Sequence, residues 1–439
     1  MMRALCSSVF DLYRDSSEFR HIASALSDDT DSFSAMSIRR VAAALKVLLE
    51  SSAALRQLMA VKRGLKYCAD AIKELFLAIR MEGGFGGKAK HPREAHLVSL
   101  CARIEIHFDI LAALVGGDAS AQEIAMRERV HEVVLGNWTT MKMASYHGSN
   151  VLLSALRFLN NFVHRNDTTK ASLIVALPSG SLRSTAAEGA RETSTTLLTQ
   201  LAQLAMGTAP NSTLRTAGDN KTSAIISTTA STVLKSLVLN AECLQWAIKS
   251  GFVAKVLADV QRRLRSLSQT SKSNQMEIQL LCNLLGILTS VASLDEGRQV
   301  VYSSSETSLG YIFEDILTTT SSKATGAEDV LRLGCLFIRN LSLSRLSKSY
   351  FAMWEGIMEL LLRRLLSEDT TSTMMTTTVT GYLSCALWSI VFDNQKARTI
   401  LVSRPSVLRK LEQVARGSAG TKDSEITGNL DRVLGLVHQ

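Results

Sequence analysis

The chain has 439 residues, of which 46% are apolar, 5% aromatic and 20% charged, and its net charge is +9. This composition supplies enough apolar side chains for a large core and excludes a wholly disordered chain. The apolar runs, such as Val151–Leu159 and Ile278–Leu288, are shorter than the ~18–20 residues that cross a bilayer. The N-terminus reaches Asp11 before a signal-peptide core is built, so we predict a soluble, cytoplasmic protein without membrane insertion.

Taken in chain order, the apolar segments have helical periodicity, with apolar residues recurring three and four positions apart. The chain has only 4 prolines and few aromatic residues, which also favours helix over sheet. The predicted helical segments are Ile38–Leu49 with Leu55–Ile79, Leu97–Val115 with Ala121–Leu135, Asn150–Val163, Val233–Leu239 with Leu244–Phe252, Cys282–Leu288, Cys335–Ser342 and Cys385–Phe392.

These segments recur with a period near 50 residues. Cys335 begins an apolar run 50 positions before the similar run that begins at Cys385, and Cys282 begins another 53 positions before Cys335. One such unit cannot offset its conformational entropy by burying its own apolar residues, so neighbouring units must stack. The sequence therefore predicts an all-α fold, an armadillo/HEAT-like α-solenoid of stacked helical repeats.

Two stretches of low complexity interrupt the repeats. Glu82–Pro92 is glycine-rich and predicts a loop between helices, whereas Ser179–Ser223 is rich in Ser, Thr, Ala and Gly. Within the second stretch, Thr195–Met206 is compatible with one helix. We therefore expect N-terminal repeats over residues 1–177, a flexible insertion over 178–223 and C-terminal repeats over 224–439.

No motif predicts catalysis, a cofactor or a metal site. The glycine-rich segment Gly83–Lys88 lacks the first glycine and the hydroxyl residue of a phosphate-binding loop. His164–Asp167 has the wrong order for a kinase catalytic loop and predicts a helix end running into a turn. His96, Cys101 and His107 are spaced by five and six residues, which does not place them on one helix face to hold zinc.

The cysteines and the basic residues also have simple structural interpretations. Six cysteines lie in apolar helical stretches without a C-x-x-C pair, which predicts small buried side chains: Cys68, Cys101, Cys243, Cys282, Cys335 and Cys385. The basic clusters Arg262–Arg265 and Arg363–Arg364 fit the solvated face of a helix. Aromatic residues are not interleaved with them, so nucleic acid is not favoured as a partner.

The surface of the solenoid is then the expected functional region. In armadillo arrays the third helix of each unit lines a concave groove in which long polar or aromatic side chains hold extended peptides. Alignment of the repeats places five candidates there: Arg157, Asn161, Arg339, Asn340 and Trp388. A purely structural role stays open for each, since Trp388 lies in an apolar run, and Arg339 and Asn340 lie near a helix end.

The segment from Ala386 to Leu401, with its Ala-Leu-Trp start and Asn-Gln-Lys-Ala-Arg block, and the segment from Arg404 to Leu411 resemble the C-terminal armadillo-like unit of the rotatin family. Leu336–Leu343, with Ser347 and Lys348 in its continuation, resembles the preceding helix of that family. The resemblance covers roughly residues 328–415. It implies a non-enzymatic scaffold that acts through protein–protein contacts with centriolar or basal-body proteins, in centriole elongation and cilium assembly, at the cytoskeleton.

Two other functions remain open from the sequence. One is a general armadillo adaptor that binds peptide segments of cargo or signalling partners and has no link to cilia. The other is an enzyme or a subunit of one, which the lack of a nucleophile, metal or nucleotide motif makes the weakest of the three.

Overall fold

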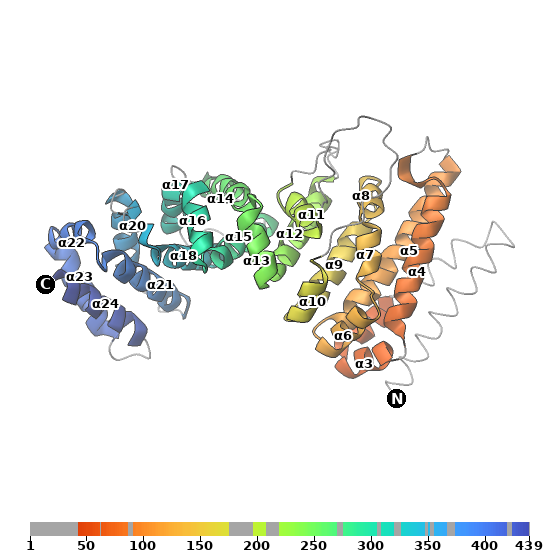
Figure 1. The fold of residues 1–439 in the computed structure, drawn as a ribbon, viewed down its shortest axis with the longest axis horizontal. Coiled ribbons are helices and arrows are strands. Elements are labelled where there is room, and N and C mark those ends of the chain that lie inside the picture. The colour runs from red at the N-terminus through yellow and green to blue at the C-terminus, as the bar shows by residue number, and fades with distance from the viewer. Residues whose placement is uncertain are drawn as a thin grey trace. The chain divides into compact units, whose positions relative to one another are not determined.

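The structure is a computed structural model in which the regular elements are helices (Figure 1). The residues it describes are 43–61, 63–86, 91–174, 196–207, 219–269, 275–304, 309–319, 326–346, 350–351, 355–366, 374–418 and 424–438. The chain divides into two compact units, Met1–Asn240 and Ala241–Gln439. They are described separately below.

The first helix that the structure describes in unit 1 spans residues 43–51. The elements that follow are α3 (Ala53–Val61), α4 (Gly64–Met81), η1 (Gly84–Gly86), α5 (His91–Val115), α6 (Ala119–Arg127), α7 (Glu132–Gly136), α8 (Trp138–Tyr146), α9 (Val151–Val163), α10 (Asp167–Ser172), α11 (Leu197–Ala205) and α12 (Asp219–Leu237). The helices α5, α9 and α12 lie side by side, with α9 packed against both of the others (Figure 1). We call this row ladder 1.

The elements that the structure describes in unit 2 are α13 (Ala241–Lys249), α14 (Phe252–Gln269), α15 (Gln275–Val291), α16 (Asp295–Ser304), α17 (Leu309–Thr318), α18 (Ala327–Ser342), α20 (Glu355–Leu365), α21 (Met374–Val391), α22 (Gln395–Val402), α23 (Pro405–Ser418) and α24 (Ser424–Val437). Here α15, α18, α21 and α24 pack in succession, each against the next, and form ladder 2. A second row, α14, α17 and α20, packs in the same way beside it. Stacked helices of successive repeats in each unit confirm the predicted all-α solenoid.

The connection after several ladder helices has the same local structure, which the sequence encodes. First, a residue with a positive φ ends the ladder helix. The next residue is an Asp or Asn, which caps the following helix because its side-chain oxygen accepts a hydrogen bond from the backbone N–H three residues further on. This pair of residues is Gly117 and Asp118 after α5, Arg165 and Asn166 after α9, and Asp393 and Asn394 after α21. The predicted helix end at His164–Asp167 is thereby confirmed.

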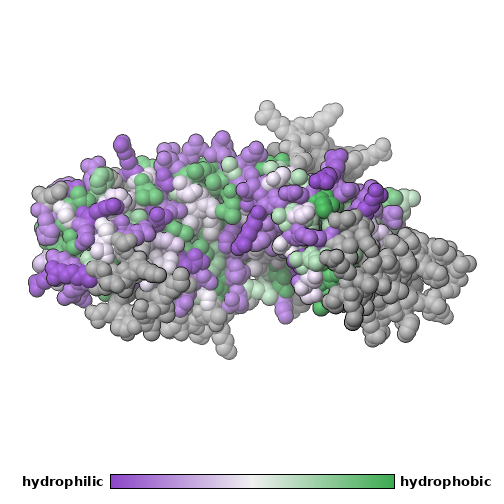
Figure 2. All heavy atoms as spheres, turned by 90° about the horizontal axis from the view of Figure 1, so that it is seen from below, coloured by the Kyte–Doolittle hydropathy of each residue, from purple (hydrophilic) through white to green (hydrophobic). Residues whose placement is uncertain are grey.

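The cores are built from the apolar faces that the periodicity predicted. Fully buried rings meet between helices: the ring centres of Phe108 on α5 and Phe158 on α9 are 6.3 Å apart, and in unit 2 the ring of Phe313 on α17 contacts those of Phe337 on α18 and Phe351. The outward faces are mixed, and Figure 2 shows hydrophilic residues interleaved with hydrophobic ones over the described part of one face. All six cysteines named above are buried thiols, as predicted.

The division into compact units differs from the predicted domain limits. The boundary lies between Asn240 and Ala241, because α12 packs against α9 and α11 of unit 1. Of the expected insertion, residues 178–195 and 208–218 lie outside the described residues. Between them, Leu197–Ala205 forms α11, which confirms the helix expected over Thr195–Met206.

None of the described helices is by itself long and apolar enough to cross a bilayer. The successive segments Lys221–Leu237 and Ala241–Lys249 reach the length and composition of a membrane span only when they are taken together.

Candidate functional site

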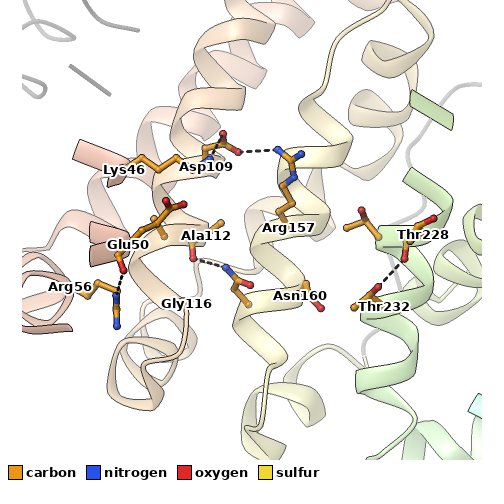
Figure 3. A pocket seen from close by; sticks show the side chains of 13 residues that line it. Lys46, Glu50, Arg56, Asp109, Ala112, Gly116, Arg157, Asn160, Thr228 and Thr232 are labelled. Atoms are coloured by element: carbon orange, nitrogen blue, oxygen red, sulfur yellow. Dashed lines mark hydrogen bonds and ion pairs between the residues drawn. The ribbon is translucent and has the colours of Figure 1, made fainter. Parts of the chain in front are cut away.

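A pocket of about 430 Å³ opens on ladder 1 (Figure 3). It lies entirely within unit 1 and is bordered by the helix over residues 43–51, α3 and the three ladder helices. Its lining residues are Lys46, Glu50, Arg56, Asp109, Ala112, Ala113, Gly116, Arg157, Asn160, Asn161, Thr228, Thr229 and Thr232. Two of the five predicted groove residues, Arg157 and Asn161, are therefore brought together here.

Asn161 does not offer its side chain to a ligand, because it is used within the fold. Its Nδ2 donates a hydrogen bond of 2.9 Å to the carbonyl oxygen of Ala112 in the last turn of α5. The last four carbonyls of a helix lack partners within that helix, so this bond satisfies one of them. Its own carbonyl accepts a bond of 2.7 Å from Nε2 of Gln122. Asn161 therefore fastens α9 to its neighbours.

Asn160, which the sequence analysis did not select, differs from Asn161 in this respect. It is half-buried and lines the pocket, and its carboxamide has no hydrogen-bond partner among the described residues. A carboxamide presents both a donor and an acceptor. It therefore matches the N–H and C=O groups of a peptide unit in an extended chain.

Charged side chains from three helices also meet in the pocket. Asp109 lies between two cations: its Oδ2 is 3.2 Å from Nζ of Lys46, and its Oδ1 is 4.0 Å from the guanidinium of Arg157 (Figure 3). The Oδ1 atom accepts no hydrogen bond from the described residues. The Arg157 side chain is 49% exposed and loosely held, so it is able to turn toward a ligand at little cost.

Other polar residues of the pocket serve the fold first. Nη1 of Arg56 donates a bond of 2.7 Å to the carbonyl of Leu49, near the end of the helix over residues 43–51. Thr229 donates to the carbonyl of Ile225 at 2.8 Å, one turn back on α12, and its oxygen keeps accepting capacity at the pocket wall. Small residues also line the pocket, namely Ala112 and Ala113 in the last turn of α5 and Gly116 directly after that helix.

The other three predicted residues lie in unit 2. Asn340 is buried, and its Nδ2 donates to the carbonyl of Thr289 at 3.1 Å, so it fastens α18 to α15. Arg339 beside it is half-buried. Trp388 is also half-buried, with the guanidinium of Arg432 lying 5.2 Å from the centre of its ring. The Trp388 side chain is thus partly open to solvent, and a cation lies over its ring.

The titratable groups with perturbed pKa values lie outside this pocket. Burial lowers the pKa of His107 to about 3, with a smaller contribution from Arg103, and burial also lowers the pKa of His131. Burial raises the pKa of the Cys68 and Cys335 thiols to about 12. Nowhere in the described part of the chain do three His, Cys, Asp or Glu side chains gather to hold a metal ion.

Helical periodicity in the sequence could have identified Asn160 as a groove residue, but not the charged residues that line the pocket with it. Arg157 and Asn160 are three residues apart on one helix and therefore face the same side. In contrast, Asp109 and Lys46 come from other helices, and only the packing of these helices within unit 1 places them near Arg157.

Comparison with known proteins supports the fold. No protein-family model matches the chain, and no curated protein is significantly similar to it. Among solved structures, the crystal complex of SYS-1 and POP-1 contains a chain with a TM-score of 0.52 and 10% identity, over 85% of this chain and 63% of that one. SYS-1 alone has a TM-score of 0.50 at the same identity and coverage.

A designed armadillo repeat protein, 16% identical, matches 65% of this chain and 93% of its own with a TM-score of 0.43. At 10% identity the two SYS-1 structures speak to the fold alone, which agrees with the all-α solenoid described above. This chain spans less than two thirds of the SYS-1 chain.

Proposed function

We propose that this protein is a non-enzymatic scaffold that binds extended segments of partner proteins on ladder 1. The observation that carries the proposal is the carboxamide of Asn160, which lines a pocket of about 430 Å³ and has no partner among the described residues. A carboxamide that is not used within the fold, next to a partly exposed arginine, is available to bind the main chain of a peptide.

The charges around the pocket indicate what kind of segment it takes. Three cations, Lys46, Arg56 and Arg157, line the pocket with two carboxylates, Glu50 and Asp109, so its net charge is only +1. A site with so small a net charge does not strongly attract an acidic or basic ligand over distance. Recognition then depends on main-chain hydrogen bonds, which an extended segment offers because its own backbone groups are unpaired.

The cellular role that we propose follows from the resemblance of residues 328–415 to the rotatin family. It is a scaffold at centrioles and ciliary basal bodies, with centriolar or basal-body proteins as partners. A protein with the same fold, SYS-1, has been crystallised as a complex with POP-1, which supports protein binding as a use of this architecture. The alternative is a general adaptor for cargo or signalling partners, and the place of the protein in the cell separates the two.

The first test is the localisation of the tagged full-length chain in ciliated cells stained for centriolar markers. Foci at basal bodies are expected. Diffuse cytoplasmic or nuclear signal would remove the centriolar role and leave the general adaptor.

The second test addresses the pocket. Proximity labelling is compared between the wild type and the Asn160→Ala, Arg157→Ala double variant, and the partners that contact ladder 1 are expected to be lost. The control is Lys66→Ala, an exposed residue of α4 outside the pocket. An unchanged set of labelled proteins in the double variant would show that the pocket is not the binding site.

A further inference from the structure

Unit 2 contains a groove of about 360 Å³ between α20 and α23. It lies at the end of the second row of helices, the row beside ladder 2. The row α14, α17, α20 packs closely helix on helix, and α23 occupies the next place along the same row. In contrast to the earlier neighbours, α20 and α23 are not closely packed, although α21 and α24 of ladder 2 remain in contact beneath them. The groove opens where this second row separates.

Basic side chains dominate the rim of this groove. Arg363 is 72% exposed and Arg404 is 34% exposed, and both lie near the carboxylate of Glu359, at 3.2 Å and 3.8 Å. Lys410 is exposed on α23 and has no partner among the described residues. Three cations around one carboxylate leave a net charge of +2, and ion pairs this exposed hold their cations weakly.

The floor of the groove is apolar. Leu362 is 2% exposed and forms the base, while Leu366 and Val407 are half-buried at its two sides. An apolar floor beneath a cationic rim is complementary to a segment that carries acidic residues beside a large apolar one.

We propose that the groove between α20 and α23 binds an acidic segment of a partner protein, with a Leu or Phe side chain on the floor and carboxylates at Arg363, Arg404 and Lys410. The residues that line the groove include no aromatic ring on which a nucleic-acid base could stack. A protein segment fits these features better than a nucleic acid. The site goes beyond the function proposed above, since that function concerns ladder 1 of unit 1.

The test uses the full-length protein and a fluorescent peptide of repeating Glu-Leu-Asp-Phe units, with binding followed by fluorescence anisotropy. The Lys410→Glu, Arg363→Glu double variant is expected to weaken binding about tenfold or more. The matched control is Arg409→Glu, which neighbours Lys410 on α23 and is exposed but does not line the groove. It is expected to retain affinity within about twofold.

Two further measurements define the ligand. A peptide with Lys in place of each acidic residue is expected not to bind, and added salt is expected to weaken the acidic peptide. Asn160→Ala is expected to have no effect, which keeps this site distinct from the pocket on ladder 1.

Three outcomes would overturn the proposal. Equal losses in the double variant and in Arg409→Glu would indicate a general charge effect. If the lysine peptide bound as tightly as the acidic one, binding would not depend on charge complementarity. Competition by a single-stranded oligonucleotide that depends on Lys410 and Arg363 would assign the groove to nucleic acid instead.

Discussion

The side-chain amide of Asn340 on α18 donates to the backbone carbonyl of Thr289 on α15, across 3.1 Å and 51 positions of sequence. The same bond occurs in the other unit, where Asn161 on α9 donates to Ala112 on α5, across 2.9 Å and 49 positions. In both, the acceptor is a carbonyl in the last turn of the preceding ladder helix, where intrahelical partners end. A repeated asparagine thus fixes the register of successive repeats.

We predict that Asn340→Ala and Asn161→Ala each destabilise the protein by about 1–2 kcal/mol, because a carbonyl in a partly buried hydrogen bond loses its donor. Asn160→Ala is the matched control and should change stability by less than about 0.5 kcal/mol, since its amide has no partner among the described residues. Urea unfolding followed by circular dichroism measures the difference. Equal stabilities of Asn160→Ala and Asn161→Ala would contradict this assignment.

The helix caps supply a second prediction. Asn394 caps α22 by accepting from the N–H of Ala397 at 3.3 Å. Asn394→Ala is expected to cost about 1 kcal/mol, whereas Asn394→Asp should be nearly neutral because aspartate accepts the same bond. Hydrogen exchange of the α22 amides should accelerate in the alanine variant only. Slow exchange in both variants would mean that packing, not the cap, holds this short helix.

Close backbone approach explains one glycine of unit 2. A Cβ atom at Gly297 would lie 2.0 Å from the carbonyl oxygen of Val291, so any side chain there requires the backbone to move. We expect Gly297→Ala to destabilise by roughly 2–3 kcal/mol. Gly356→Ala, on α20, meets nothing within 4 Å and should be neutral or stabilise by up to about 1 kcal/mol. Thermal unfolding of the two variants measures the difference in stability. If both substitutions changed the stability equally, the prediction would be wrong.

The buried imidazole of His107 predicts a pH dependence of stability. Its pKa falls to about 3 in the folded protein because burial disfavours the charged form, whereas the unfolded chain titrates near 6.5. Between these values the unfolded state binds the extra proton, so the contribution of His107 is fully present above pH 6.5 and is lost as the pH falls toward 3.

The free energy of unfolding of the wild type, relative to His107→Leu, should therefore fall by about 2 kcal/mol between pH 7.5 and pH 5. Urea unfolding of both proteins at the two pH values gives this difference directly, and other titrating groups cancel in it. A difference that does not change with pH would show that His107 titrates in the folded state as it does in the unfolded one.

Most of the fold was predictable because its signals are local. The period of 50 residues between Cys335 and Cys385 placed two helices that indeed stack as α18 and α21. The helix ends were readable from Asn166 and Asn394, since a cap acts within three residues of itself. The limits of the two units were harder to predict from the sequence, because α12 belongs to unit 1 through its packing against α9 and α11, and this packing leaves no local sequence pattern.

The sequence by itself determined that this protein consists of stacked amphipathic helices, because periodicity and capping are properties of neighbouring residues. Only the tertiary structure decided which of two adjacent asparagines is free: Asn161 meets the end of α5, whereas Asn160 faces the pocket. It also decided that Asp109 lies between Lys46 and Arg157, and that α20 and α23 separate into a basic groove. These features depend on side chains from different repeats, and their relative positions are set by packing across tens of residues rather than by any local preference.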